Sequence, residues 1–444
     1  MSDNLLERAI SRRAVEAALW GVPAVNFEMM LQALQRDMGG APNQIVYWSR
    51  LLDWKNQTLT PNPDAVYLMA FFDTSDGPVV LEIPPAVGGS ITGSVDSAWQ
   101  TAVADVGIAG IDAGKGARYL LLPPGFDERV PDGFEVLRPE TFSGFALLRS
   151  NLGGSSDSDL TAAVNYGLQV RLYPLSAGPD SETIFLDASD IVFDALLPDG
   201  IDFFTALNRR IQAEPWLTRD KAMIDRLATF GMVKGSPFEP DEATAKLLTD
   251  AAAEARAWLD QQYTELFTTG FAPGARWVLP AKPALVKAMT AGFTDPDTYP
   301  TDARSVTYSF AFFSAKTLGT GQFYLMTIAD SDGRDFDGSQ HYRLRVPPQV
   351  PVTLYWSVTA YDRATHALIR DMPWASRSSN TPDLQVGDDG SVELFFGPTP
   401  PAAGESNWIP TPEGRRFEAL FRFYGPTPQL YDHTWTLPDI ERLT

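Results

Sequence analysis

The chain has 444 residues, of which 56 are Asp or Glu and 35 are Lys or Arg, so its formal net charge is −21. This charge argues against nucleic acid and anionic membrane surfaces as partners, because both attract basic protein surfaces. The chain has no cysteine and three histidines, which excludes disulfides, thiolate metal sites and cysteine nucleophiles and argues against a histidine-rich metal centre.

The first 40 residues are predicted to form an N-terminal helical segment. Apolar residues recur at helical spacing within residues 5–19, which indicates an amphipathic surface helix. The segment has neither the basic start nor the unbroken apolar run of a signal peptide, and no stretch of the chain approaches 18 consecutive apolar residues. We therefore expect a cytoplasmic protein, although a chain from which a leader had been removed would look the same.

Residues 41–175 are predicted to form an antiparallel β-sandwich. Short apolar runs at 65–72, 79–83 and 119–122 are separated by turn sequences such as Asp-Gly at 76–77. Short strands at this spacing are typical of sandwiches and barrels.

Residues 176–275 are predicted to form a helical bridge. The stretches 203–211, 221–230 and 241–267 have helical periodicity. Acidic residues favour a helix start at Asp241, since a carboxylate accepts from free backbone N–H groups there.

Residues 276–444 are predicted to form a second β-sandwich. β-Branched and aromatic residues are concentrated at 306–313, 323–328, 352–358 and 417–424, as is typical of strands.

The two β-rich regions share landmarks in the same order. Leu-Glu-Ile-Pro-Pro at 81–85 parallels Leu-Arg-Val-Pro-Pro at 344–348, and a Pro- and Gly-containing run followed by a strand ending in Arg occurs later in both. These landmarks indicate an internal duplication. The alternative is that unrelated β-sandwiches often have strands followed by proline-containing turns. The sequence leaves both explanations open.

The segment Leu-Thr-Pro-Asn-Pro-Asp-Ala-Val-Tyr at 59–67 resembles the hallmark of the DUF1254 family, a Pro-Asn-Pro-Asp-Thr-Leu-Tyr-like sequence. The C-terminal half resembles the companion DUF1214 domain at 330–333, 344–348, 356–362, 388–391, 396–398, 407–409 and 422–424. The resemblance implies a mainly β protein with helices (α+β), in which two jelly-roll-like antiparallel β-sandwiches are joined by a helical segment. It also implies a homo-oligomer, which we expect to be a dimer or tetramer, and relatives that are often exported. It brings no settled reaction.

The Asn62-Pro63-Asp64 turn leading to Tyr67 is the first candidate site. We expect Asn62 to donate to a ligand oxygen, Asp64 to act as a base or an acceptor, and Tyr67 to donate its phenol. Asn and Asp beside proline also build Asx-turns, so the alternative is a capped turn that enters a strand.

An aromatic residue accompanies a carboxylate at the ends of two matching runs, Asp96 with Trp99 and Asp362 with Tyr361. Such pairs suit polyhydroxylated ligands, because aromatic faces stack on sugar rings and carboxylates bind hydroxyl groups. If the two aspartates faced one cleft, acid–base hydrolysis of a glycosidic bond would become possible. The alternative is that the aspartates close turns beside core aromatic residues.

The polar loop at 377–380 is a candidate anion clamp. Arg377 with neighbouring hydroxyl groups and Asn380 can hold a carboxylate, sulfate or phosphate, although the alternative is a plain surface loop. For Trp408 we favour a role in packing the core over a role in stacking against a ligand. Asp330 begins an aspartate-rich run that fails the EF-hand test, because position twelve is His341.

These candidates favour a cofactor-independent hydrolase or lyase that acts on a small polar or carbohydrate-like molecule, with no metal. In this interpretation Asp64, Tyr67 and Tyr361 are catalytic. The substrate-binding residues would be Asn62, Asp96, Trp99, Asp362, Arg377, Asn380 and Trp408. Two alternatives stay open: a non-catalytic module that binds a carbohydrate or similar small molecule, and a scaffold whose β surfaces serve oligomerisation. Nucleic acid and membranes are not expected as partners.

Overall fold

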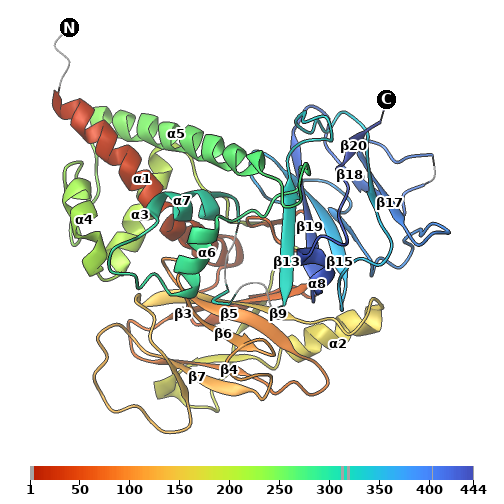
Figure 1. Ribbon diagram of the computed structural model, residues 1–444. Helices are drawn as coiled ribbons and strands as arrows, with labels where there is room; N and C mark the ends of the chain where they lie inside the picture. Colours follow the sequence, from red (N-terminus) through yellow and green to blue (C-terminus); the bar gives the residue numbers. More distant parts are fainter. Residues whose placement is uncertain (1–4, 312–314, 318–320, 403, 444) are drawn as a thin grey trace.

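The structure is a computed structural model that describes residues 5–311, 315–317, 321–402 and 404–443. It confirms the predicted fold class, a mixed α+β protein whose helices accompany two domains built of antiparallel-rich, open sheets. The N-terminal sheets form the lower part of the molecule and the C-terminal sheets stand beside them on the right (Figure 1). Among the described residues, none of the helices has the combination of length and apolar character that crossing a bilayer requires.

The N-terminal domain consists of a larger and a smaller sheet packed face to face. The larger sheet runs in the order β11 (Phe185–Asp187), β1 (Gln44–Tyr47), β3 (Val66–Asp73), β9 (Ser143–Ser150), β5 (Ile91–Ser97) and β6 (Ala102–Gly107). The smaller sheet runs in the order β10 (Arg171–Pro174), β4 (Val79–Ile83), β7 (Ala117–Leu121) and β8 (Glu135–Leu137). Alternate residues of β3, such as Leu68 and Phe72, enter the core between these sheets.

The C-terminal domain is a second pair of sheets with its own core. One sheet runs in the order β13 (Gln322–Thr327), β19 (Phe417–Tyr424), β15 (Trp356–Asp362) and β16 (Ser376–Ser378). The other runs in the order β18 (Trp408–Pro410), β17 (Val392–Gly397), β14 (Tyr342–Val346) and β20 (Glu441–Arg442). Phe421 and Phe423 of β19 pack against Leu344 and Phe396 of the facing sheet.

The two domains have the same strand order. The series β3-β9-β5-β6 corresponds to β13-β19-β15-β16, and β10-β4-β7-β8 corresponds to β20-β14-β17-β18. The last pair of the smaller sheet is parallel in both domains, β7 with β8 and β17 with β18, which is an uncommon detail to share by chance. The topology therefore favours an internal duplication over a chance similarity of strands and proline-containing turns.

Helices cover the face of the larger N-terminal sheet that is turned away from its sandwich. They are α1 (Leu5–Gln32), α3 (Gly200–Ala213), α4 (Lys221–Ala228), α5 (Glu242–Glu265), α6 (Pro283–Thr290) and α7 (Thr301–Phe310). Helices α1 and α5 lie side by side (Figure 1). Met69, Phe71, Phe145 and Leu147 point from β3 and β9 into the apolar core that these helices complete. Both faces of this sheet are therefore buried.

Helix α1 is longer and more central than its predicted role as an amphipathic surface helix. Leu5 and Leu6 are exposed, but almost every residue from Ala17 to Leu31 is buried. Its small residues allow close packing, since a Cβ at Gly21 would lie 2.8 Å from Leu207 of α3. The prediction holds for the first turns only, because helices α3, α4, α5 and α7 pack against α1.

Two strand predictions in the C-terminal half are wrong in position or type. Residues 306–310, predicted as part of a strand, form the end of helix α7, and residues 312–313 lie outside the described residues. Burial of Val306, Tyr308 and Phe310 against the helical core outweighs their strand preference. The strand predicted at 352–358 begins only at Trp356, where pairing with β19 starts.

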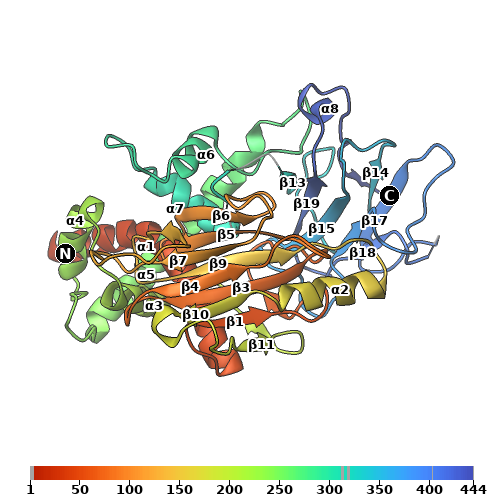
Figure 2. The same cartoon turned by 90° about the horizontal axis from the view of Figure 1, so that it is seen from below.

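The remaining elements are short or peripheral. Helix α2 (Asp157–Gly167) packs on β3 and β9 at the end of the N-terminal domain nearest the C-terminal sheets (Figure 2). Strands β2 (Asn56–Gln57) and β12 (Phe193–Asp194) pair with each other, and α8 (Pro428–Tyr431) follows β19. Asp241 caps α5 by accepting a hydrogen bond from the Thr244 amide (2.8 Å), as its position before the helical run predicted.

Candidate functional site

The segment between β2 and β3, residues 58–65, crosses from the N-terminal domain onto the C-terminal domain. Tyr361 of β15 donates its phenol to the Pro61 carbonyl (2.6 Å). Ser376 of β16 donates to Oδ1 of Asp64 (3.1 Å). The Asn-Pro-Asp turn is therefore part of the interface between the two domains.

Asn62 combines the two roles that its sequence context allows. Its Oδ1 accepts from the Asp64 amide (3.0 Å), which is the Asx-turn of the structural alternative. Its Nδ2 also donates to the phenol oxygens of Tyr424 (2.6 Å) and Tyr355 (3.4 Å) in the other domain. Asn62 is buried, so these bonds hold the turn against the C-terminal sheet.

Asp64 has an incompletely satisfied carboxyl group. Oδ1 accepts from Ser376, but no described residue donates to the buried Oδ2 with good geometry, although the nearby Ser357 hydroxyl lowers the pKa of the group. Burial raises the pKa of Asp64, and this outweighs the opposing effects of Arg422 and Ser376. A carboxyl group in this state holds a proton more readily than an exposed aspartate does.

A Tyr–Arg pair occupies the same position in each domain. Arg149 of β9 lies opposite Tyr67 of β3, and Arg422 of β19 lies opposite Tyr324 of β13. The guanidinium carbon is 5.0 Å from the ring centre in the first pair and 5.5 Å in the second, so both are cation–π contacts. Arg149 also donates through Nε to the Tyr67 phenol (3.1 Å).

Arg422 is enclosed by hydrogen-bond acceptors. Nη1 donates to Oγ1 of Thr359 (2.9 Å), and Nη2 donates to the Tyr361 phenol (2.5 Å). Nη2 also lies 3.0 Å from the Thr60 carbonyl and 3.3 Å from that of Pro61. Two of these acceptors come from the segment that crosses from the other domain, so Arg422 joins the domains.

The remaining members of the site are phenols. Burial raises the pKa of Tyr361 to about 12 and also raises the pKa values of Tyr324, Tyr355 and Tyr424. These phenols therefore stay protonated and can donate hydrogen bonds at neutral pH. We call the following set the interdomain cluster: Asn62, Asp64, Tyr67, Arg149, Tyr324, Tyr355, Tyr361, Arg422 and Tyr424.

The residues of the interdomain cluster fall within two stretches of the chain that match known families. Residues 42–174 match the family described as "Protein of unknown function (DUF1254)" and residues 321–428 the family described as "Protein of unknown function (DUF1214)". The chain is a DUF1254/DUF1214 two-domain protein. The DUF1254 domain supplies the Asn-Pro-Asp turn, Tyr67 and Arg149, and the DUF1214 domain supplies the other members.

Two solved structures are similar to the chain to different degrees. The VPA0106 protein from Vibrio parahaemolyticus is 18% identical, with a TM-score of 0.58 and coverage of 98% of this chain and 100% of that one. An uncharacterized protein from Burkholderia cenocepacia is 11% identical, with a TM-score of 0.42 and coverage of 98% and 94%. No curated protein matches the chain. The first comparison shows that the fold of the whole chain is shared.

Asp96 and Trp99 lie in the helix-covered core of the DUF1254 domain and make no contact with the interdomain cluster among the described residues. Asp96 is in β5 and fully buried, and neither carboxylate oxygen has a hydrogen-bond partner there. Burial raises its pKa well above the usual range. Trp99 packs against Trp20 of α1, with ring centres 4.5 Å apart.

Asp362 and Asn380 close turns in the DUF1214 domain. Asp362 accepts from the Ala364 amide (2.9 Å) and pairs with Arg415 (2.5 Å). The Asn380 amide donates to Oγ of Ser378 (3.2 Å). Both arrangements agree with the structural alternatives, and no described contact joins Asp362 to the carboxylate with which it was expected to share a cleft.

Arg377 and Trp408 are bound within the DUF1214 domain. Arg377 donates to the backbone carbonyls of Ser406 (2.7 Å) and Glu405 (3.0 Å) and is buried, which lowers its pKa. Trp408 donates to the Gly397 carbonyl (2.9 Å) and is buried. The donors of Arg377 are therefore committed to the protein's own backbone.

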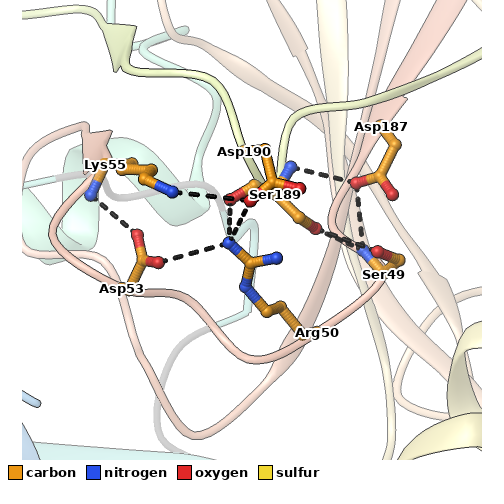
Figure 3. A network of polar contacts seen from close by, with 7 residues as sticks. All are labelled: Ser49, Arg50, Asp53, Lys55, Asp187, Ser189 and Asp190. Carbon is orange, nitrogen blue, oxygen red and sulfur yellow. Dashed lines mark hydrogen bonds and ion pairs between the residues drawn. The ribbon is translucent and has the colours of Figure 1, made fainter.

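A network of ion pairs and hydrogen bonds supports the start of the crossing segment from the opposite side (Figure 3). Arg50 donates to Oδ1 of Asp190 (2.8 Å) and lies near Asp53 (3.5 Å), while the Ser49 amide donates to Oγ of Ser189 (2.8 Å). Asp190 is largely exposed, so we assign this network a supporting role.

The sequence contained a signal for the unpredicted members of the cluster. Tyr-Leu-Met occurs at 67–69 and again at 324–326, at the same position of β3 and β13. This repeat points to Tyr324 as the counterpart of Tyr67 and, through strand pairing, to Arg422 as the counterpart of Arg149. In the described part of the chain, no group of three or more His, Asp or Glu side chains is arranged to hold a metal ion.

Proposed function

We propose that the protein binds a small polar molecule at the interdomain cluster. The observation that carries this proposal is the convergence of Asp64, Tyr67 and Tyr361, three residues selected from the sequence as candidate catalytic groups, from two domains onto one set of polar side chains. Sites between domains are common places for small-molecule binding.

The composition of the cluster supports a binding role over a purely structural one. It contains two guanidinium groups and five phenols, and neither guanidinium forms an ion pair with a carboxylate of the described residues. Burying so many polar groups costs free energy that apolar residues in the same interface would avoid. Asp64, Arg149, Tyr324 and Tyr355 each retain part of their residue surface, so the cluster lies close to the surface of the molecule.

Acid–base catalysis of the hydrolase or lyase type is the second candidate. Asp64 favours it, because a buried carboxyl with a raised pKa and an unpartnered oxygen has the properties of a general acid or base. Tyr67 and Tyr361 would then bind and orient the substrate through their phenols.

The experiment is a thermal-shift screen with sugars and organic acids on the wild-type chain and on Y67F and D64N. A bound molecule raises the melting temperature by mass action. We expect the shift to fall in both variants and to persist in Y173F, a matched control whose phenol bonds to Glu82 outside the cluster. An unchanged shift in Y67F and D64N would exclude the cluster as the binding site.

Catalysis is tested on any molecule that this screen identifies. NMR spectra of that molecule are recorded over time with wild-type protein and with D64N. Turnover that is lost in D64N while binding persists would support the second candidate. Binding without turnover by wild-type protein would leave binding alone as the function.

A further inference from the structure

The duplicated Tyr–Arg pairs occupy equivalent positions but have different surroundings. Arg149 lies between Tyr67 and Thr92 on neighbouring strands, and Arg422 lies between Tyr324 and Ser357. A tyrosine and a small hydroxyl residue therefore flank each arginine on its neighbouring strands.

Arg422 is the closed copy. Its terminal nitrogens donate to Thr359, Tyr361 and the carbonyls of residues 60–61, and its side chain is buried. Both of its terminal nitrogens donate to the protein and the side chain is buried, so a ligand would have to displace these contacts to reach them. The role of Arg422 is therefore to hold the crossing segment in place.

Arg149 is the open copy. Its Nε donates to Tyr67, but Nη1 and Nη2 donate to none of the described residues, and no carboxylate among them forms an ion pair with it. Arg149 as a whole residue has intermediate exposure, in contrast to the fully buried Arg422. Burial by itself would lower the pKa of Arg149, but the phenols of Tyr67, Tyr324 and Tyr424 raise it, so the group stays charged.

The sequence explains why Arg149 stays open. Where β15 offers Thr359 and Tyr361 to Arg422, the equivalent positions of β5 are Ser94 and Asp96. Ser94 instead donates to Asp105 (2.7 Å).

Residues 315–317 reach the DUF1254 sheet from the other domain, and they also bind Asp105. The amides of Lys316 and Thr317 donate to its two oxygens, at 2.7 and 2.8 Å. The acceptor that binds this segment is thus a carboxylate of the DUF1254 sheet, and no hydrogen bond joins Arg149 to the segment's described residues, 315–317.

Two open nitrogens on one guanidinium form a planar fork that matches a carboxylate. Of the two arginines in the cluster, Arg422 is buried and bound to the protein and Arg149 has the open nitrogens, so a ligand with a single negative charge is better matched than a phosphate dianion. The phenols around Arg149 are protonated donors and add to the preference for an oxyanion.

We propose that the small molecule bound at the interdomain cluster is a monocarboxylate whose carboxylate group is held by the open arginine, Arg149. This inference rests on the proposed function, since it names the class of ligand for the same site.

The test is calorimetric titration at constant ionic strength with propionate and gluconate. Each has an uncharged counterpart, propionamide and sorbitol, and inorganic phosphate is the third class of probe. We expect the two carboxylates to bind, their counterparts to bind at least tenfold more weakly, and R149Q to weaken carboxylate binding roughly 10- to 100-fold. R149K should bind with intermediate affinity, because it keeps the charge but lacks the fork.

The matched control is R171Q. Arg171 also lies over a tyrosine ring, that of Tyr173 at 5.1 Å, but on the smaller DUF1254 sheet. Carboxylate binding should be unchanged in R171Q. Unaltered circular dichroism spectra establish that each variant is folded.

Three results would overturn the inference. Equal binding of gluconate and sorbitol, unaffected by R149Q but lost in Y67F, would reject the carboxylate and leave the proposed function standing. Phosphate binding as tight as that of the carboxylates, and lost in R149Q, would reject the restriction to monocarboxylates. Absence of carboxylate binding rejects the inference, and the proposed function falls with it only if the wider screen also yields no ligand that depends on Tyr67.

Discussion

The DUF1254 and DUF1214 domains share one strand order, yet they use equivalent positions in opposite ways. In the DUF1214 domain, Tyr361 binds the duplicated arginine and the neighbouring domain. At the equivalent position of the DUF1254 domain, Asp96 is buried without a partner among the described residues. Duplication thus supplied a common framework, and a few substitutions at the interface made one copy structural and left the other available.

The exchange of segments between the domains shows the same contrast. Residues 58–65 lie on the DUF1214 sheet and bind through carbonyls and a carboxyl group, with Ser376 as one donor. Residues 316–317 lie at the DUF1254 sheet and bind through amide N–H groups, with Asp105 as the acceptor. Ser376 and Asp105 are at equivalent positions of β16 and β6, so the residue at this position decides whether a carboxyl group or amide N–H groups dock there.

The largest expected effect separates the two arginines. R422Q should destabilise the protein by roughly 3 kcal/mol or more, because several charge-assisted hydrogen bonds are lost inside the interface. R149Q should cost less than about 1 kcal/mol, since it loses one hydrogen bond and one partly exposed cation–π contact. Urea unfolding measures both.

Equal losses of stability in the two variants would contradict the distinction between an open and a closed arginine. A change in the dependence of unfolding free energy on urea would instead indicate that the domains no longer unfold together.

A smaller effect is expected from Asp96. Burial raises its native pKa well above the value in the unfolded chain, so the native state binds this proton more tightly. Stability from this group is therefore present at low pH and is lost as the pH rises above the unfolded value of about 3.9. D96N removes the titration and should be more stable than wild type at pH 7, by roughly 1.4 kcal/mol for each unit by which burial raises the native pKa above the unfolded value.

Melting temperatures of wild type and D96N between pH 4 and pH 8 measure this difference. The gap should widen with rising pH. A constant gap, or a wild type that is the more stable at pH 7, would show that Asp96 is ionised and compensated in the native protein. D64N is the comparison, with a smaller gain expected because Ser376 and Arg422 oppose the shift at that site.

The smallest effect distinguishes the two tyrosines. Y67F should cost about 1 kcal/mol, because the phenol oxygen accepts from Arg149 (3.1 Å) and from the Asn62 amide (3.4 Å). Y173F provides the scale for loss of one phenol outside the cluster. Thermal unfolding detects such differences, and a loss in Y67F below that in Y173F would show that the Tyr67 hydroxyl contributes little to the cluster.

The regular elements were well predicted where local pattern and tertiary burial agree. Val79–Ile83 and Phe417–Tyr424 form β4 and β19 with the predicted bounds, since their alternating or continuous apolar residues face cores on both sides. The run at 306–310 was predicted as a strand and forms a helix. Its aromatic residues lie in the core that α7 shares with helices α1 and α5, where their burial outweighs their strand preference.

The candidate site was predicted in part. Asn62, Asp64, Tyr67 and Tyr361 meet at one place, although no spacing in the sequence indicated that they would. Arg149 and Arg422 were not selected, because an arginine inside a strand resembles any other solvated arginine until the neighbouring strands are known. Arg377 looked available in the sequence, but tertiary contacts with residues 405–406 occupy its donors.

The sequence by itself determined that the protein is acidic and consists of two β-sandwiches with helices. It also limited the reactive side chains of a site to carboxylates, phenols, amides and arginines. Only the tertiary structure decided which of these groups meet and which arginine stays open. The physical reason is that hydrogen-bond satisfaction is a long-range property: the acceptors that close Arg422 come from residues 60–61, some 360 positions away in the chain. Local pattern predicts strands and turns, but it does not identify such partners.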